Sequence, residues 1–348
     1  MPAYAPSRPL LYFLASLLVL AFWLSLVVGP TGMALADAWR AIMHLLGAPV
    51  DLGEAQARAA LIIGQIRLPR ALLAVGVGAI LAMTGVAMQG LFRNPLADPA
   101  LIGVSSGASL GAAAAIVLLP LLGQLPAGLE PYWLSICAFL GGLAITSMVY
   151  RLGRRDGRTD VATMLLAGIA LTALAGACIG LLTYLADDTA LRSLMFWNLG
   201  SLGGATLPRV WPVLAVGLAL AVWLPRRANA LNVLLLGESE ARHLGFPVEA
   251  IKRELVLCTA LGVGVAVAAV GMIGFVGLIV PHLVRLATGP DHRTLLPASA
   301  LAGGVLLLLA DLLARVPLAP AELPIGLVTA LLGAPFFLWL LARRADRC

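Results

Sequence analysis

The most constraining feature of the sequence is a long uncharged stretch that turns back on itself. Arg67 and Arg70 precede it, and no side chain in residues 71–92 is charged. A polar turn with two prolines follows at residues 93–99, and the chain returns to apolar sequence at Ala100. A helix crosses the hydrocarbon core of a bilayer in about 20 residues. The stretch therefore predicts a membrane hairpin rather than part of a water-soluble domain.

The composition extends this interpretation to the whole chain. Of its 348 residues 61% are hydrophobic and 11% are charged, and the mean hydropathy is +0.99, whereas soluble domains carry about 25% charged residues. In a bilayer only helices and closed barrels satisfy their backbone groups, and the alternating pattern of barrel strands does not occur in the sequence. We therefore predict an all-α, polytopic membrane protein.

Unbroken apolar runs predict ten transmembrane helices in one transmembrane domain, residues 1–348. They cover about residues 10–29, 67–91, 100–120, 132–151, 160–185, 208–225, 255–271, 274–288, 295–314 and 325–342. Several are short or rich in glycine, so we expect tilted or broken helices among them. The glycines favour close helix packing, and the lining of a pathway that changes width is the alternative. The first run could also be a signal peptide, but it is longer than the usual core of 7–15 residues, which favours a retained helix.

The distribution of basic residues predicts the orientation. If the N-terminus is cytoplasmic, ten crossings return the C-terminus to the cytoplasm, and 16 of the 23 basic residues lie on that side against 7 outside. This bias follows the positive-inside rule. Only one of the 23, Lys252, is a lysine, and no basic stripe with interleaved aromatic residues indicates nucleic acid. We therefore predict a multi-pass membrane protein with both termini cytoplasmic, whose surroundings are lipid and not nucleic acid.

Motifs for catalysis do not occur in the sequence. A P-loop needs a glycine-rich loop before a lysine and a Ser or Thr after it, and Lys252 has neither. No His-Glu-x-x-His motif occurs, and the histidines at 44, 243, 282 and 292 do not form a ligand pair within a predicted span. We therefore predict no catalytic residue, no metal site and no cofactor bound by this chain.

The cytoplasmic loop of residues 231–254 carries a distinctive pattern. Residues 238–244 suit a short helix, Gly245 is placed to end it, and Pro247 suits the first turn of another helix. Two short helices separated by a glycine would form a compact knob that fits a groove in a cytoplasmic partner. The alternative is an amphipathic segment that lies on the lipid headgroups.

Several motifs, in order and at compatible spacing from about residue 60 to the C-terminus, resemble a known family. They are residues 67–70 (Arg-Leu-Pro-Arg) with 89–99 and 101–108, residues 237–238 with 244–245, residues 274–282 with 291–293, and residues 310–311, 321–326 and 333–336. In these motifs the chain resembles the permease subunits of type II ABC importers for iron-siderophores, haem and cobalamin. The resemblance implies the type II ABC importer permease fold and a transport function without an ATPase site in this chain.

The resemblance also implies partners and site residues. The partners are a second copy of the chain, two cytoplasmic subunits that bind ATP and Mg, and a periplasmic substrate-binding protein. The coupling helices of the family map onto residues 238–244 and 247–254, so the residues implied to couple to the ATPase are Glu238, Ser239, Glu240, Ala241, Arg242, His243, Leu244 and Gly245. The outer-face arginines that receive glutamates of the binding protein match Arg67, Arg70 and Arg315. Guanidinium groups bind carboxylates bidentately, which suits that task, although snorkelling at a helix end is the simpler explanation for Arg67 and Arg70.

The substrate and its path are less determined by the sequence. A path along the dimer axis is implied, and motif position suggests Met83, Met88, Gln89 and Ser105 as lining residues. We predict an importer permease for a bulky metal chelate, haem or an iron-siderophore, with cobalamin as the alternative. An ion-coupled secondary transporter is a rival of another class, but it would need acids at span centres, and the acids of the predicted spans map near span ends.

Overall fold

The structure is a computed structural model, and it describes residues 8–30, 32–49, 53–122, 128–155 and 157–345. The predicted cytoplasmic terminal residues 1–7 and 346–348 lie outside this part of the chain. The helices are α1 (Arg8–Val27), α2 (Leu35–Leu45), α3 (Glu54–Ile62), α4 (Leu68–Leu91), α5 (Val104–Leu122), α6 (Glu130–Leu152), α7 (Val161–Leu185), α8 (Asp188–Asn198), α9 (Leu207–Arg226), α10 (Ala228–Leu234), α11 (Glu238–His243), α12 (Val248–Val270), α13 (Val276–Thr288), α14 (His292–Arg315) and α15 (Ile325–Ala345). Two further helical turns, η1 (Ile63–Arg67) and η2 (Pro99–Ile102), and an antiparallel hairpin of β1 (Arg154–Arg155) with β2 (Arg158–Thr159) complete the described elements.

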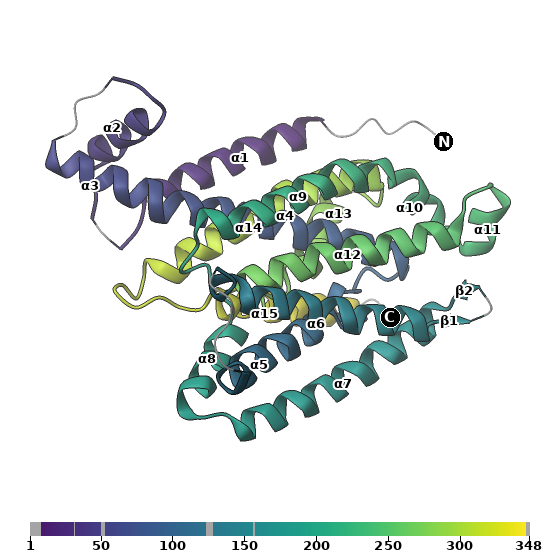
Figure 1. Ribbon diagram of the computed structural model, residues 1–348. Helices are drawn as coiled ribbons and strands as arrows, with labels where there is room; N and C mark the ends of the chain where they lie inside the picture. The colour runs from purple at the N-terminus through teal and green to yellow at the C-terminus, as the bar shows by residue number, and fades with distance from the viewer. Residues whose placement is uncertain (1–7, 31, 50–52, 123–127, 156, 346–348) are drawn as a thin grey trace.

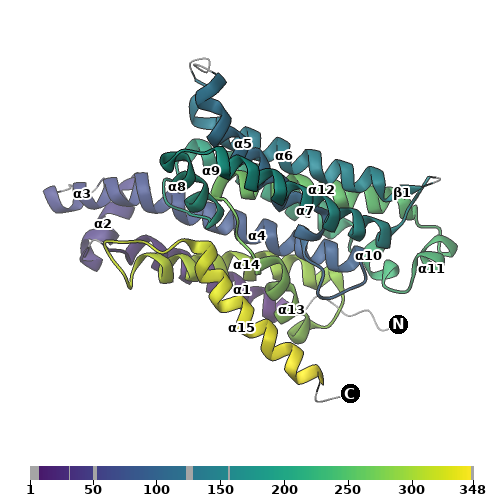
Figure 2. The same ribbon diagram turned by 90° about the horizontal axis from the view of Figure 1, so that it is seen from below.

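The long helices run side by side as a bundle with two distinct ends (Figures 1 and 2). One end carries α2, α3 and α8, together with the connection from α14 to α15. The other end carries α10, α11 and the β1–β2 hairpin, and there α1 begins and α15 ends. The predicted cytoplasmic loop and the predicted cytoplasmic ends of the first and last spans therefore lie at the same end of the molecule.

Each of the ten predicted spans contains one apolar helix. Seven described helices are long and apolar enough to cross a membrane, and three shorter apolar stretches lie in α5, α13 and α15. The expectation of broken helices is met by α13, whose 13 residues extend only about 20 Å at 1.5 Å per residue. A helix of that length does not span a hydrocarbon core of about 30 Å, so the predicted span at 274–288 is a short helix rather than a full crossing.

The sequence did not predict α2, α3, α8 and α10, and it divided α12 into two helices. The short helices lack the long apolar run by which membrane spans are recognised. Helices α2 and α8 each carry an acidic residue in the first turn, which is favourable for the helix dipole. The predicted second coupling helix, residues 247–254, is not a separate helix. It is the first part of α12, which runs without a break from Val248 into the predicted span.

Helix α4 lies at the centre of the bundle, and other helices approach its backbone closely from several sides. It packs against α9, α12, α13 and α14, and 83% of its most apolar stretch is buried inside the chain. Gly78 faces Gly303 of α14, and Gly85 faces Gly277 of α13, where a Cβ atom would lie 2.2 and 2.0 Å from a backbone carbonyl oxygen. These glycines pack helices together, which confirms the packing interpretation for this part of the chain.

The helix that contains α4 is continuous from Glu54 to Leu91, with one change of winding at η1. Pro69 has no N–H to give to the carbonyl of Gln65, and its ring would crowd that carbonyl in a regular α-helix. At η1 the Leu68 N–H instead donates to the carbonyl of Ile63, five residues back, which is the π-helical pattern. The wider turn lets the helix pass through the Arg-Leu-Pro-Arg motif without a break.

Candidate functional site

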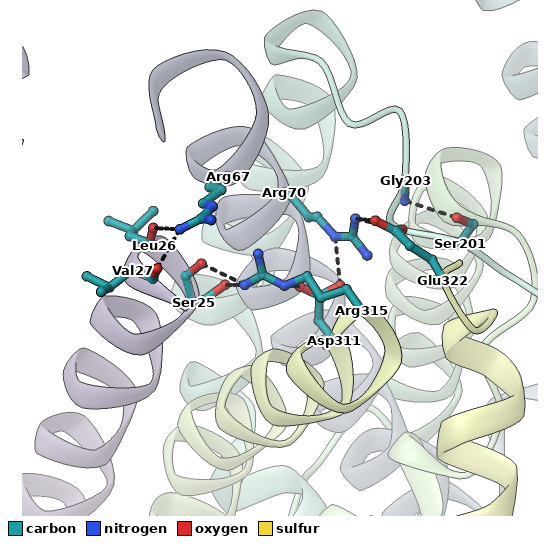
Figure 3. Close-up of polar contacts among 10 residues, drawn as sticks. All are labelled: Ser25, Leu26, Val27, Arg67, Arg70, Ser201, Gly203, Asp311, Arg315 and Glu322. Atoms are coloured by element: carbon teal, nitrogen blue, oxygen red, sulfur yellow. Dashed lines mark hydrogen bonds and ion pairs between the residues drawn. The ribbon is translucent and has the colours of Figure 1, made fainter. Parts of the chain in front are cut away.

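At the end that carries α2 and α3, buried ion pairs join distant parts of the chain (Figure 3). The Nε atom of Arg70, on α4, lies 2.8 Å from Oδ1 of Asp311 on α14, and its Nη1 donates to both oxygens of Glu322 at 2.9 and 3.0 Å. Asp311 is fully buried, whereas the Glu322 side chain is 38% exposed. The pair therefore ties α4 to α14 and to the segment that leads into α15.

The other two arginines of this end bind the first helix. Arg315 lies one turn after Asp311, at 3.1 Å, and its Nη2 donates to the backbone oxygen of Ser25 at 2.6 Å. The Nη1 of Arg67 donates to the carbonyls of Leu26 and Val27 at 2.8 and 2.6 Å. Cations are favourable at a helix C-terminus, so both arginines hold the end of α1 against the bundle.

The three arginines predicted to receive the binding protein are buried in the structure. Arg67, Arg70 and Arg315 do lie together at one end of the bundle, but they are only 3%, 7% and 3% exposed and their partners belong to the same chain. They are not snorkelling side chains, and in this conformation they do not present themselves to another protein. The sequence missed Asp311 and Glu322 as their partners, although the four-residue spacing of Asp311 and Arg315 was a usable signal.

Three of the four residues predicted to line the path lie inside the subunit. Met83, Met88 and Gln89 are 1%, 0% and 2% exposed, so they cannot line a path on the dimer axis in this conformation. Gln89 instead accepts a hydrogen bond from Arg285 of α13 at 2.7 Å. Ser105 lines a small cavity of about 20 Å³, and its role in the path stays a prediction. In the described part of the chain no group of three His, Cys, Asp or Glu side chains is placed to hold a metal ion.

At the opposite end the predicted knob is present as α11. The helix runs from Glu238 to His243, and Gly245, with φ of +81°, ends it in a left-handed conformation. The N–H groups of Gly245 and Phe246 donate to the carbonyls of Arg242 and Ala241, which is the Schellman arrangement. Pro247 lies one position before the first turn of α12 rather than in it.

The surface of α11 is suited to a protein contact. Ala241 is fully buried and anchors the helix, while Leu244 is 60% exposed at its end. The exposed residues are Ser239, Glu240, Arg242, His243, Leu244 and Gly245, and Glu238 is half-buried. The knob thus offers one apolar side chain among polar ones, and its role in coupling stays a prediction at this point.

Helix α7 is the least enclosed of the long apolar helices. Only 17% of its most apolar stretch is buried, and Ala173, Gly176, Ala177 and Gly180 are exposed at the three- and four-residue spacing of one face. Small residues on one face allow two helices to approach closely in a membrane. Helix α15 also presents large apolar side chains, including Leu331 and Leu338 at 64% and 66% exposure.

Comparison with known proteins accounts for this architecture. Residues 17–343 match the family described as the FecCD transport family. The chain belongs to the FecCD transport family. A solved metal-chelate type ABC transporter in an inward-facing conformation superposes on this FecCD chain with a TM-score of 0.82 at 33% identity, covering 97% of this chain and 99% of that one. The predicted fold, that of a type II ABC importer permease, is thereby confirmed.

Named relatives of this FecCD chain are transport permeases. The hemin transport system permease protein HmuU of Yersinia pestis is 50% identical over 288 residues, which is 81% of this chain and 83% of that protein. The vitamin B12 import system permease protein BtuC of Salmonella typhi is 47% identical over 290 residues, 83% of this chain and 86% of that protein. The two identities are close, so the names alone do not separate haem from cobalamin.

Proposed function

We propose that this FecCD-family chain is the permease subunit of an ATP-driven importer of the bacterial inner membrane, with both termini cytoplasmic, and that it carries haem or another bulky iron chelate. The likeness to HmuU over 81% of the chain is the observation that carries this proposal. Cobalamin is the alternative substrate, because the likeness to BtuC is almost as strong. Both are large chelates, which agrees with a path between two subunits rather than within one.

Exposed surfaces of the chain support the proposed partners. The small-residue face of α7 and the apolar face of α15 support contact with a second copy of the chain. The exposed α11 supports docking of two cytoplasmic subunits, which would bind ATP and Mg and hydrolyse the ATP. The chain itself would then be a transport subunit and not an enzyme, and the binding protein would approach the end that carries α2 and α3.

The proposal predicts how a reconstituted transporter responds to its substrate. The permease, its ATPase subunits and a binding protein are placed in vesicles, and ATP hydrolysis is measured with the binding protein loaded with haem, a ferric siderophore or cobalamin. We expect haem or the siderophore to stimulate hydrolysis and uptake, and we expect the purified chain alone to hydrolyse no ATP.

Three outcomes separate the alternatives. Stimulation by cobalamin alone would contradict the iron-chelate substrate and leave the importer intact. Uptake that follows a proton gradient without ATP would contradict the importer and favour an ion-coupled transporter. A proton uncoupler is the control, because an ATP-driven importer should keep working in its presence.

The predicted contact with the binding protein also stays a proposal, and Glu322 provides its test. An acidic side chain of the binding protein would compete with Glu322 for Arg70, because Glu322 already accepts two hydrogen bonds from Nη1 of that guanidinium. Glu322→Gln removes the competing charge, so capture of the binding protein at low salt should strengthen about fivefold, which corresponds to about 1 kcal/mol, the upper end for an exposed ion pair. Glu54→Gln, at an exposed carboxylate of the same end, is the matched control, and unchanged capture by Glu322→Gln would contradict the contact.

A further inference from the structure

The single lysine of the chain is buried beneath α11 and contacts three elements. Lys252, in the second turn of α12, is 1% exposed. Its Nζ lies 2.6 Å from Oε1 of Glu238 on α11, donates to the carbonyl of Thr159 on β2 at 2.7 Å, and lies 3.7 Å from Glu249 on α12. A buried ammonium is costly unless its donors are satisfied, so these acceptors fix its position.

The same turn of α12 holds the β1–β2 hairpin by a second bond. The backbone N–H of Thr159 donates to Oε2 of Glu249 at 2.8 Å, while its carbonyl accepts from Lys252. Both backbone polar groups of Thr159 are therefore bound by side chains of α12. The end of the hairpin cannot move independently of Lys252 and Glu249 without losing these bonds.

Helix α11 is separated from α10 and from α12 by a glycine with positive φ on each side, so it does not continue into either helix. Gly237 has φ of +126° and Gly245 has φ of +81°. Arg242 also links α11 to Glu249, but at 3.5 Å and with its side chain 42% exposed, and exposed pairs contribute little. The buried Lys252–Glu238 pair is consequently the stronger polar link between α11 and the rest of the chain.

The hairpin leads directly into α7. Asp160, the residue after Thr159, caps α7 by accepting from the N–H groups of Ala162 and Thr163, so a displacement of Thr159 displaces the first turn of the helix. Helix α7 is the long apolar helix that its own chain encloses least. A pull on its first turn therefore works against fewer contacts within the same chain than a pull on α4 or α14 would.

We propose that Lys252 is a positioning residue that carries the movement of α11, caused by the ATPase subunits, through Thr159 to α7. The proposal rests on the proposed function, in which α11 is the docking point of the ATPase. It assigns Lys252 to the coupling of ATP hydrolysis to transport rather than to docking.

The test uses the whole transporter in vesicles. For Lys252→Met, ATPase subunits should still co-purify with the permease, whereas the number of ATP molecules hydrolysed per substrate imported should rise about 5- to 10-fold, a typical size for coupling between sites. Glu238→Gln removes the charge from the α11 side alone and should raise the same ratio. It provides the test if Lys252→Met folds poorly. Lys252→Arg should restore part of the coupling, and Arg226→Met, at an exposed position in the last turn of α9, should change it little.

A distance measurement separates coupling from general stability. Spin labels are placed at Ser239 on α11 and at Arg158 on the hairpin, both exposed, in a chain whose four cysteines are replaced. In the otherwise unchanged chain the distance between the labels should be the same without nucleotide and with trapped ATP, because the two elements move together. With Lys252→Met it should differ between the two states.

Either of two results would overturn the proposal, and a third measurement tests the proposed function instead. A constant label distance in Lys252→Met, or an unchanged ratio of hydrolysis to transport in both Lys252→Met and Glu238→Gln, would remove Lys252 from the coupling path. Leu244→Glu on the exposed surface of α11 should abolish co-purification of the ATPase. If it does not, the docking role of α11 fails, whatever the lysine variants show.

Discussion

Replacing Gly78 by isoleucine is expected to prevent the subunit from accumulating as a folded protein. A Cβ atom at this position would lie 2.2 Å from the carbonyl oxygen of Gly303 and 2.6 Å from its carbon. These are backbone atoms of α14, so the clash is relieved only if α4 and α14 move apart along their shared contact. Overpacked cores lose about 1–3 kcal/mol or more, and we expect a value at or beyond the top of that range because no side chain can turn away.

The measurement is the yield of monodisperse protein after detergent extraction, together with its thermal unfolding. Gly176→Ile is the matched control, because a Cβ atom on Gly176 of α7 meets nothing within 4 Å. The control subunit should fold normally, even if a changed α7 face alters its pairing with a second copy. Normal yield and stability of Gly78→Ile would show that α4 and α14 are not packed as described.

Asp311→Asn is expected to cost about 3–5 kcal/mol of the free energy of unfolding, the usual range when one partner of a buried ion pair is removed. The carboxylate is fully buried between Arg70 at 2.8 Å and Arg315 at 3.1 Å. Asparagine has nearly the shape of aspartate but no charge, so Arg70 and Arg315 lose the negative charge that they share. The loss should appear as a large fall in the thermal midpoint in detergent.

Two further variants check the cause. Glu322→Gln removes a carboxylate from the same network, but at 38% exposure of its side chain it should cost no more than about 1 kcal/mol. Adding Arg315→Met to Asp311→Asn removes one of the stranded charges, so the double variant should be more stable than the sum of the two single changes predicts. Equal losses for Asp311→Asn and Glu322→Gln would contradict the assigned burial.

The sequence predicted the features that depend on short stretches of chain. Apolar runs locate the membrane helices, and the pair Gly245 and Pro247 locates α11 and the start of α12 to within about a residue. The pattern could not show that this start belongs to the same helix as the predicted span at 255–271, because the first two turns of α12 are as polar as a surface loop. It also could not reveal α2 or α8, since a short amphipathic helix outside the membrane lacks a long apolar run.

The candidate sites were harder to predict because they depend on pairing across the chain. Arg70 and Glu322 are 252 positions apart, and nothing local to either residue names the other. Arginines at the entrance of an apolar helix are expected to reach outward, but here the buried Asp311 binds Arg70 and the carbonyls at the end of α1 bind Arg67. The sequence around Lys252 excludes a P-loop, and its position three residues after Glu249 is a local signal for the ion pair between them.

The continuous helix from Glu54 to Leu91 has a mechanical consequence. Its 38 residues extend about 57 Å at 1.5 Å per residue, whereas a bilayer with its headgroups is about 40–45 Å thick. The rod is thus about 12 Å or more longer than the bilayer is thick, and its α3 end extends from the bundle (Figures 1 and 2), while α4 lies at the centre of the bundle. A protein that pressed on α3 would deliver its force to α4 directly, and the π-helical turn η1 is the point where the rod could bend.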